Sequence, residues 1–163
     1  MDRSYNSARV LRFLADANVG RLGRWLRALG YDADYEPRLP DSGLVARARA
    51  EGRVLLTRDQ ELMRRRAVVG GEVRAILLRD GDLGGQLRQV ARELGLSLDL
   101  ALTRCLECNL ELVPRSADEV AHRLPPRVRE RQRRFTQCPG CGRVYWPGSH
   151  WERMRRRLAA MAP

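Results

Sequence analysis

The sequence has no lysine, few aromatic residues and no long apolar segment. A membrane-spanning helix needs about 20 consecutive apolar residues, and no stretch approaches that length, so we expect no membrane association. Without lysine there is no Walker A phosphate loop, and Gly20-Arg-Leu-Gly23 lacks the glycine fingerprint of dinucleotide-binding folds. The function classes that depend on a bound nucleotide cofactor are therefore not expected.

The missing lysine has two readings. All 31 residues counted as Lys or Arg are arginine, which suits bidentate contacts to phosphate. A GC-rich genome also favours arginine codons, and it explains the absence of lysine better. Base composition does not choose basic over acidic residues, so the formal net charge of +11 needs its own cause. A polyanionic partner such as RNA is the expected one.

The only four cysteines form two pairs, Cys105-Leu-Glu-Cys108 and Cys138-Pro-Gly-Cys141. Disulfides and redox thiols are the alternatives, but the chain begins Met1-Asp2-Arg3 with no apolar signal segment, so a reducing cytoplasm is expected. There, two Cys-x-x-Cys pairs favour one zinc ion with Zn–S bonds of about 2.3 Å. Four thiolates leave no open position for water, so the Zn²⁺ is expected to be structural. Gly140 and Gly142 are expected to supply positive φ at the second knuckle.

Apolar runs alternate with helical patterns before the first cysteine. The strands are expected at 10–15, 32–36, 53–57 and 73–78, and the helices at 22–29, 41–51, 60–66 and 83–94. Continuous apolar strands joined by helices predict an α/β fold, with a mostly parallel sheet and helices on both faces. A small four-cysteine zinc ribbon is expected to follow, with a helix at 117–123 and a short basic helix at the C-terminus.

Acidic residues follow several expected strands. Asp16 follows the first, Asp59 the third, and Asp80 or Asp82 the fourth. Function in parallel sheets lies at the carboxyl ends of the strands, and carboxylates gathered there suit a divalent cation. The alternative for Asp16 and Asp59 is an N-terminal helix cap, and for Asp80 a solvated surface acid.

The sequence resembles PIN-like nucleases, and more closely the Mut-seven C-terminal RNase family, over roughly residues 10–155. The motifs that carry the resemblance are Asp16-Ala-Asn18, Leu22-Gly-Arg24-Trp25-Leu26-Arg27, Leu29-Gly30-Tyr31-Asp32, Asp41, Arg53-Val-Leu-Leu-Thr57-Arg58-Asp59, Gln86-Leu87, Arg104-Cys105-Leu-Glu-Cys108-Asn109, Leu124-Pro125-Pro126 and Cys138-Pro-Gly-Cys141-Gly-Arg-Val-Tyr145-Trp146-Pro-Gly148-Ser149-His150-Trp151. They extend over nearly the whole chain, and the tail motif is specific.

The resemblance implies a metal-dependent ribonuclease, with a PIN-like domain over residues 10–100 and a zinc-ribbon module with a basic C-terminal tail over residues 101–155. It implies Mg²⁺ or Mn²⁺ bound by Asp16, Asp41 and Asp59, with Glu61 as a fourth catalytic acid. Asp80 and Asp82 compete with Glu61 for that place. Asp41 has a near-equal alternative as an ordinary helix-start residue.

Arginines close to these acids are expected to neutralise RNA phosphates. Three of them recur at a spacing of three residues along the first helix, and others adjoin Asp59. The residues expected to contact RNA are Asn18, Arg21, Arg24, Arg27, Arg58, Arg64 and His150. Any single arginine could instead be solvated on the surface or paired with an acid. These alternatives do not explain the summed positive charge.

Three functions remain open from the sequence. The first is a single-chain ribonuclease whose zinc ribbon grips RNA or packs beside the active site. The second is a non-catalytic RNA- or ribosome-binding protein with a degenerate acidic site. The third, a toxin-type PIN nuclease with an antitoxin partner, is disfavoured by the long basic C-terminal module.

Overall fold

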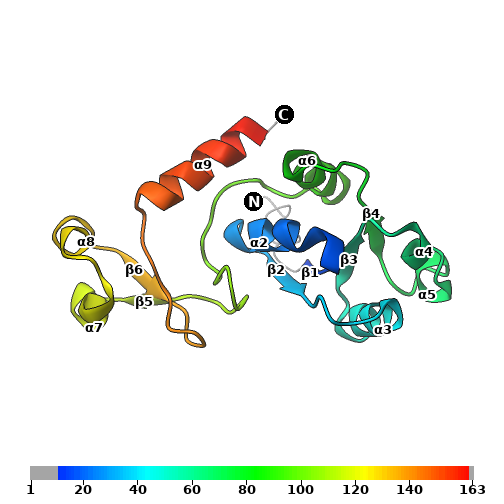
Figure 1. The fold of residues 1–163 in the computed structure, drawn as a ribbon, viewed down its shortest axis with the longest axis horizontal. Coiled ribbons are helices and arrows are strands. Elements are labelled where there is room, and N and C mark those ends of the chain that lie inside the picture. Colours follow the sequence, from blue (N-terminus) through cyan, green and yellow to red (C-terminus); the bar gives the residue numbers. More distant parts are fainter. Residues whose placement is uncertain (1–10, 162–163) are drawn as a thin grey trace, which may run out of the picture.

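The computed structural model describes residues 11–161, so residue 10 of the expected first strand lies outside the described residues. A parallel four-stranded sheet with helices lies beside a small antiparallel sheet (Figure 1). The parallel strands are β1 (Arg12–Ala15), β2 (Asp32–Tyr35), β3 (Val54–Thr57) and β4 (Ala75–Leu77), in the order β2-β1-β3-β4. This arrangement confirms the predicted α/β class.

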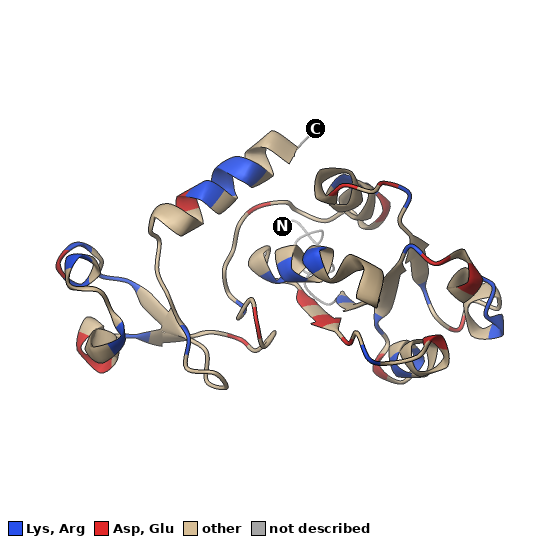
Figure 2. Ribbon diagram, in the orientation of Figure 1, with Lys and Arg blue, Asp and Glu red and all other residues tan. Residues whose placement is uncertain are grey.

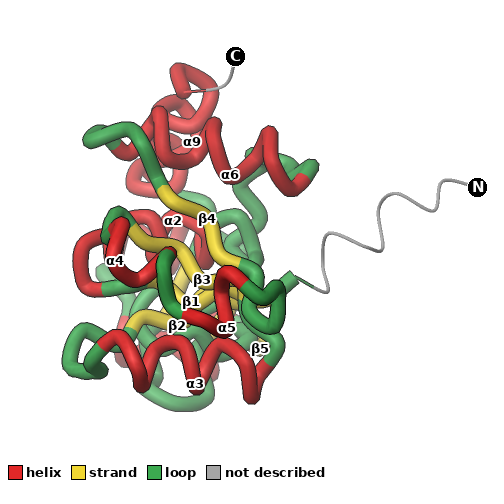
Figure 3. Tube along the Cα trace, turned by 90° about the vertical axis from the view of Figure 1, so that its right-hand side faces the viewer, coloured by secondary structure: helices red, strands yellow, loops and turns green. Residues whose placement is uncertain are grey.

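Both faces of the parallel sheet are covered by helices (Figure 3). The helices of this part are η2 (Ala17–Val19), α2 (Gly20–Ala28), α3 (Asp41–Glu51), α4 (Gln60–Met63), α5 (Arg66–Val69) and α6 (Leu83–Leu94). Phe13 and Leu56 pack on the face that carries α2 and α6. Leu14 and Leu55 pack on the opposite face, against α3 and α4. Alternate strand residues point to opposite faces, so doubly covered strands are apolar throughout.

The expected helix at 60–66 is instead two short helices, α4 and α5. Arg65 breaks them apart with an extended ψ of 137°. The break brings Leu62, Ala67 and Val68 to one hydrophobic cluster. In a continuous helix, Ala67 and Val68 would point about 140° and 120° away from Leu62, because each residue turns the chain by about 100°. Burial of this apolar set therefore favours the interrupted form.

The second part holds an antiparallel sheet in the order β5-β6-β7. Its elements are β5 (Val113–Arg115), α7 (Ala117–Val120), η3 (Ala121–Arg123), α8 (Pro126–Arg131), β6 (Phe135–Gln137) and β7 (Val144–Tyr145). Val120, Leu124 and Phe135 form its small core, and Trp146 packs on Phe135 with ring centroids 6.4 Å apart. The helix expected at 117–123 corresponds to α7 and η3 together.

The basic C-terminal segment forms α9 (Ser149–Met161), which runs from the antiparallel sheet back to α6 (Figure 1). Leu158 joins the core beneath α2 and α6, and Met154 packs with Ala28 and Leu106. The Arg157 guanidinium lies 5.6 Å from the centroid of the Trp25 ring. The helix α9 is thus packed against α2 and α6 of the part that contains the parallel sheet. Among residues 11–161, no helix combines the length and the apolar character needed to cross a bilayer.

Candidate functional site

Asp16 lies at the carboxyl end of β1, beside β3. The chain moves from β1 to β2 on one side and places β3 on the other, so β1 and β3 form the switch point where ligands bind in such sheets. Asp16 is buried, with 7% of the residue exposed. Its Oδ1 accepts a hydrogen bond from Ala17 N at 2.5 Å, and its Oδ2 accepts one from the Asn18 amide at 3.3 Å.

Thr57 connects the ends of the two strands. Its buried hydroxyl donates to Asp16 Oδ2 at 2.8 Å and accepts from Asp59 N at 2.9 Å. Asp59 Oδ1 in turn accepts from Glu61 N at 2.8 Å and caps α4. The helix-cap geometry considered for Asp16 and Asp59 is therefore present at both positions. Thr57 belongs to the sequence motif, but its link between Asp16 and Asp59 could not be predicted, because it depends on the pairing of β1 with β3.

The other acids have separate partners. Asp41 is the first residue of α3, and its Oδ2 lies 3.2 Å from Nη2 of Arg65. Glu61 is exposed and forms an ion pair with Arg64 at 2.8 Å. Outside this group, Asp82 caps α6 by accepting from Gly85 N at 3.1 Å.

The expected carboxylate ligands do not form a tight cluster. Within residues 11–161, four cysteines are the only set of three or more His, Cys, Asp or Glu residues whose ligand atoms all lie within 4.8 Å of one another. Asp16 and Asp59 are joined through Thr57, whereas Asp41 is held by Arg65. The side chains of the three aspartates are thus not arranged as a complete Mg²⁺ or Mn²⁺ site.

A cleft of about 580 Å³ is lined by the residues that follow Asp16, from Ala17 onward. Four of the residues expected to contact RNA line it, namely Asn18, Arg21, Arg24 and Arg27. Tyr35 of β2, Glu107 of the first cysteine knuckle and Gln86 of α6 also line it. The cleft therefore extends from the sheet edge, along α2, to the cysteine-bearing loop.

The cationic surface continues beyond this cleft. A smaller cavity of about 250 Å³ is lined by Arg24, Arg143 and His150, so Arg24 borders both hollows. Glu107 lies between the two arginines, 2.5 Å from Arg24 and 4.0 Å from Arg143. Figure 2 shows basic positions along both α2 and α9.

Arg27 differs from the other arginines of α2. It is buried, its Nε donates to Ala33 O at 2.6 Å, and its Nη1 donates to the carbonyls of Leu106 and Glu107 at 2.9 and 2.8 Å. Desolvation lowers the pKa of Arg27, partly opposed by Asp34. These contacts fix the cysteine loop on α2 and β2. Arg27 therefore has a structural role, whereas Arg21 and Arg24 are the arginines of α2 that remain candidates for binding phosphate.

Replacing Arg27 with methionine is expected to lower the free energy of unfolding by at least about 3 kcal/mol. The change leaves three carbonyl groups, two of them in buried hydrogen bonds, without their charged donor, and hydrogen bonds to charged groups contribute about 1.5–3 kcal/mol each. Urea denaturation measures the loss. Arg21→Met, on an exposed position of the same helix, is the control and should change stability by no more than about 0.5 kcal/mol. Equal effects of the two variants would contradict the anchoring role.

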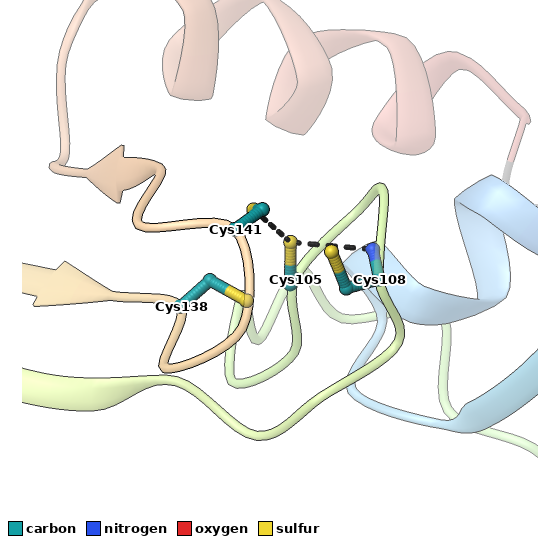
Figure 4. Close-up of side chains that lie close together, drawn as sticks. All are labelled: Cys105, Cys108, Cys138 and Cys141. Atoms are coloured by element: carbon teal, nitrogen blue, oxygen red, sulfur yellow. Dashed lines mark hydrogen bonds between the residues drawn. The ribbon is translucent and has the colours of Figure 1, made fainter.

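The four cysteine side chains converge from two loops (Figure 4). Sγ of Cys105 lies 3.7 Å from Sγ of Cys141. Two sulfurs on one tetrahedral zinc ion with bonds of about 2.3 Å are about 3.8 Å apart. The donor set and the spacing thus fit a zinc ion, and this four-cysteine cluster can form a zinc site.

The two knuckles use the same backbone turn. The residue after each second cysteine adopts positive φ, 62° at Asn109 and 71° at Gly142. Each turn is closed by a bond to the carbonyl of the first cysteine, from Asn109 N to Cys105 and from Gly142 N to Cys138, both at 3.0 Å. The expectation for Gly140 is wrong, because its φ is not positive. A Cβ at this position would lie 2.6 Å from Leu110 Cδ1, so the Leu110 side chain would have to move.

The thiols influence one another's protonation. Burial raises the pKa of Cys105, but hydrogen bonds from Tyr145 and from backbone amides outweigh it and lower that pKa to about 7. The neighbouring Cys141 thiol, with burial and the charge of Cys105, raises the pKa of Cys108 to about 12. Several thiolates this close together repel one another, so a cation is needed to hold all four deprotonated.

The model of the Mut7-C RNAse domain family matches residues 11–158. The chain belongs to the Mut7-C RNase domain family. This match covers nearly the whole chain and confirms the resemblance found in the sequence. No curated protein and no solved structure matches the chain. Membership of the Mut7-C family indicates a nuclease function that involves RNA.

In this Mut7-C chain, the first cysteine knuckle is docked on the edge of the parallel sheet by Asn109. Its Oδ1 accepts from Ala33 N at 3.0 Å, and its Nδ2 donates to Asp32 and Asp34 at 2.7 and 3.0 Å. Burial raises the pKa of Asp32, but hydrogen bonds from Arg53 and Asn109 make the net shift a lowering. The sequence motif contained Asn109, but only the structure shows that it covers the open edge of β2.

Proposed function

We propose that this Mut7-C chain is a metal-dependent ribonuclease that hydrolyses RNA phosphodiester bonds. The observation that carries the proposal is the link from Asp16 through Thr57 to Asp59 at the switch point of the sheet, next to an arginine-lined cleft. The proposed Mg²⁺ or Mn²⁺ ligands are Asp16, Asp41 and Asp59, and Glu61 is the fourth proposed catalytic acid. A bound divalent ion would supply an activated water and stabilise the leaving oxygen.

The chain's own residues prepare this reaction. Thr57 and Asn18 orient Asp16 by donating to its Oδ2, and Thr57 positions the backbone of Asp59. Recruitment of Asp41 requires its carboxylate to leave Arg65, an exposed ion pair of the kind that contributes about 0–1 kcal/mol. That cost is small against the binding of a divalent ion by several carboxylates.

RNA is the proposed substrate and binding partner. Arg21 and Arg24 would neutralise phosphates in the cleft, and His150 would extend the track toward α9. Arg58 directly precedes Asp59 and Arg64 follows the last residue of α4, and both would contact phosphates near these acids. Neutralised phosphates release counterions, so binding should weaken steeply with salt.

The four cysteines are proposed to bind a structural Zn²⁺. We assign residues 10–100 to the nuclease domain and residues 101–155 to the ribbon module, with α9 as the tail that returns to α6. Thiolate ligands are preserved in a reducing compartment, so the cytoplasm is the proposed location.

One observation favours a second function, a non-catalytic RNA- or ribosome-binding protein. The ion pair between Asp41 and Arg65, with the wide spacing of the acids, is the arrangement of a degenerate site. A nuclease assay on single-stranded and structured RNA, with and without Mn²⁺, separates the two. Mn²⁺-dependent cleavage supports the ribonuclease, and salt-sensitive binding of uncleaved RNA supports the binding protein.

Glu107→Gln is expected to tighten RNA binding about two- to fivefold at low salt. Glu107 forms ion pairs with Arg24 and Arg143, and exposed ion pairs of this kind contribute about 0.2–1 kcal/mol. Removing the carboxylate frees both cations for phosphate. Fluorescence anisotropy with a labelled RNA measures the change. Glu111→Gln, which breaks an exposed ion pair with Arg104 outside the cleft lining, is the control and should leave affinity unchanged.

A further inference from the structure

Tyr35 is an exposed aromatic side chain at the catalytic edge of the sheet. It is the last residue of β2 and keeps 39% of its surface exposed. Its register partner on β1 is Ala15, the residue directly before Asp16. It also lines the cleft that contains Asn18 and Arg21. An aromatic ring therefore lies on the wall of this cleft, one strand away from the end of β1 that leads into Asp16.

Gly20 makes room for this ring at the start of α2. A Cβ on Gly20 would lie 2.6 Å from Cε2 and 2.7 Å from Cζ of Tyr35. The backbone of Gly20 is ordinary helix, with φ −57° and ψ −32°, so its conformation does not require glycine. Glycine in a helix costs about 1 kcal/mol relative to alanine. The close approach of the ring is what the missing side chain permits.

The other aromatic groups near the cationic surface are already engaged. Arg157 lies over Trp25, Arg155 lies over Trp151, and Trp146 packs on Phe135. Among residues 11–161, Tyr35 is the one Phe, Tyr or Trp residue that is exposed. It is thus the described ring best placed to stack on a ligand.

We infer that Tyr35 is a stacking platform for one unpaired RNA base, next to the phosphate that reaches Asp16. This inference rests on the proposed RNA substrate and narrows it to single-stranded RNA. Bases inside a duplex are stacked on their neighbours, whereas an unpaired base offers its face to an aromatic ring. The cleft volume of about 580 Å³ lies within the range of about 300–1,000 Å³ typical of small-ligand pockets, so it has room for a nucleotide.

The first test measures binding of a fluorescent single-stranded RNA and of its duplex without added Mg²⁺ or Mn²⁺. Tyr35→Ala should weaken single-strand binding about 5- to 150-fold, the range for losing one base–aromatic stack. Tyr35→Phe keeps the ring and should stay within about twofold of the wild type. Duplex affinity should not change. Val69→Ala removes another exposed apolar side chain, on α5 and outside the cleft lining, and is the control.

Gly20→Ala supplies a second, independent variant. Alanine favours the helix but displaces the ring, so single-strand affinity should fall while thermal stability of α2 is retained or only slightly reduced. A third arm replaces one nucleotide at a time with an abasic residue. At the stacked position, the wild type should lose affinity and Tyr35→Ala should lose none further, because the same contact is removed by either change.

The outcomes separate this subsite from the ribonuclease function. Cleavage of RNA with equal affinity of wild type and Tyr35→Ala for every oligonucleotide would overturn the subsite alone. Binding that depends on Tyr35 without any cleavage would support the subsite and overturn hydrolysis. A wild-type protein that neither binds nor cleaves RNA would overturn both. A loss of duplex and single-strand affinity in equal measure would show a structural role for the ring.

Discussion

Asp59→Asn and Asp16→Asn are each expected to reduce Mn²⁺-dependent RNA cleavage by about 1,000-fold or more. A carboxylate that ligates the ion contributes several kilocalories per mole to transition-state stabilisation, and about 4 kcal/mol corresponds to that factor. Asparagine keeps nearly the same shape but loses the charge. Initial rates on a single-stranded RNA at saturating Mn²⁺ measure the effect.

The two variants should both keep the fold, for different local reasons. At position 59, the amide oxygen of asparagine can still accept from Glu61 N and cap α4, so stability should change little. At position 16, Ala17 N donates to one carboxylate oxygen and Thr57 and Asn18 to the other, so the new NH₂ group faces a donor in either orientation and about 1 kcal/mol of stability should be lost. Thermal unfolding separates this loss from the loss of activity.

Asp118→Asn is the matched control for both variants. Asp118 is an exposed acid in the first turn of α7, far along the chain from β1 and β3. It changes the net charge by the same unit without touching the proposed site. Cleavage that survives unchanged in Asp59→Asn or Asp16→Asn would refute the assignment of these acids. A similar loss in all three variants would reveal a general charge effect.

The elements of the fold were predictable because their signals are local. Buried strands are apolar on both faces, and helices such as α3 and α6 end at Gly52 and Gly95, which adopt φ of 62° and 66°. The four-cysteine cluster was predictable for the same reason, since its ligand spacing lies within two short motifs. These features depend on neighbours within a few residues along the chain.

The roles of individual charged residues were not predictable from spacing. Arg21, Arg24 and Arg27 recur every three residues, but each step of three turns the helix by about 300°, so Arg27 points about 120° away from Arg21. That rotation carries Arg27 toward β2 and the cysteine loop, into the interior. The family motif pointed to Asp41 as a candidate ligand. Its ion pair with Arg65 could not be predicted, because Arg65 is 24 residues away along the chain.

Cys138→Ser is expected to release zinc and unfold the β5-β6-β7 sheet, while the parallel sheet persists at reduced stability. Structural zinc contributes roughly 10–16 kcal/mol of apparent binding free energy in zinc-finger peptides, far more than the small apolar core of this part could supply alone. The core of the parallel sheet contains most of the buried apolar residues and does not depend on the ion. Zinc content and amide hydrogen exchange measure the two effects.

The loss should spread beyond the ribbon because the first knuckle is built into the cleft. Without the ion, Cys105 and Cys108 are no longer held together, and the bonds from Arg27 to Leu106 and Glu107 lose their fixed acceptors. Exchange should therefore increase at Ala33, whose amide is covered by Asn109, as well as in β6 and β7. RNA affinity should fall at the same time, since Leu106 and Glu107 line the cleft.

Leu110→Ala is the control, because it removes an exposed apolar side chain beside the same site without removing a ligand. Exchange confined to β6 and β7, with Ala33 still protected, would show that the knuckle docks on the sheet without the ion. Unchanged exchange throughout would contradict a structural zinc. The expected pattern, in which Ala33 and β6 open together, would make the metal centre part of the proposed RNA cleft, because one ion would then hold both the ribbon and one wall of that cleft.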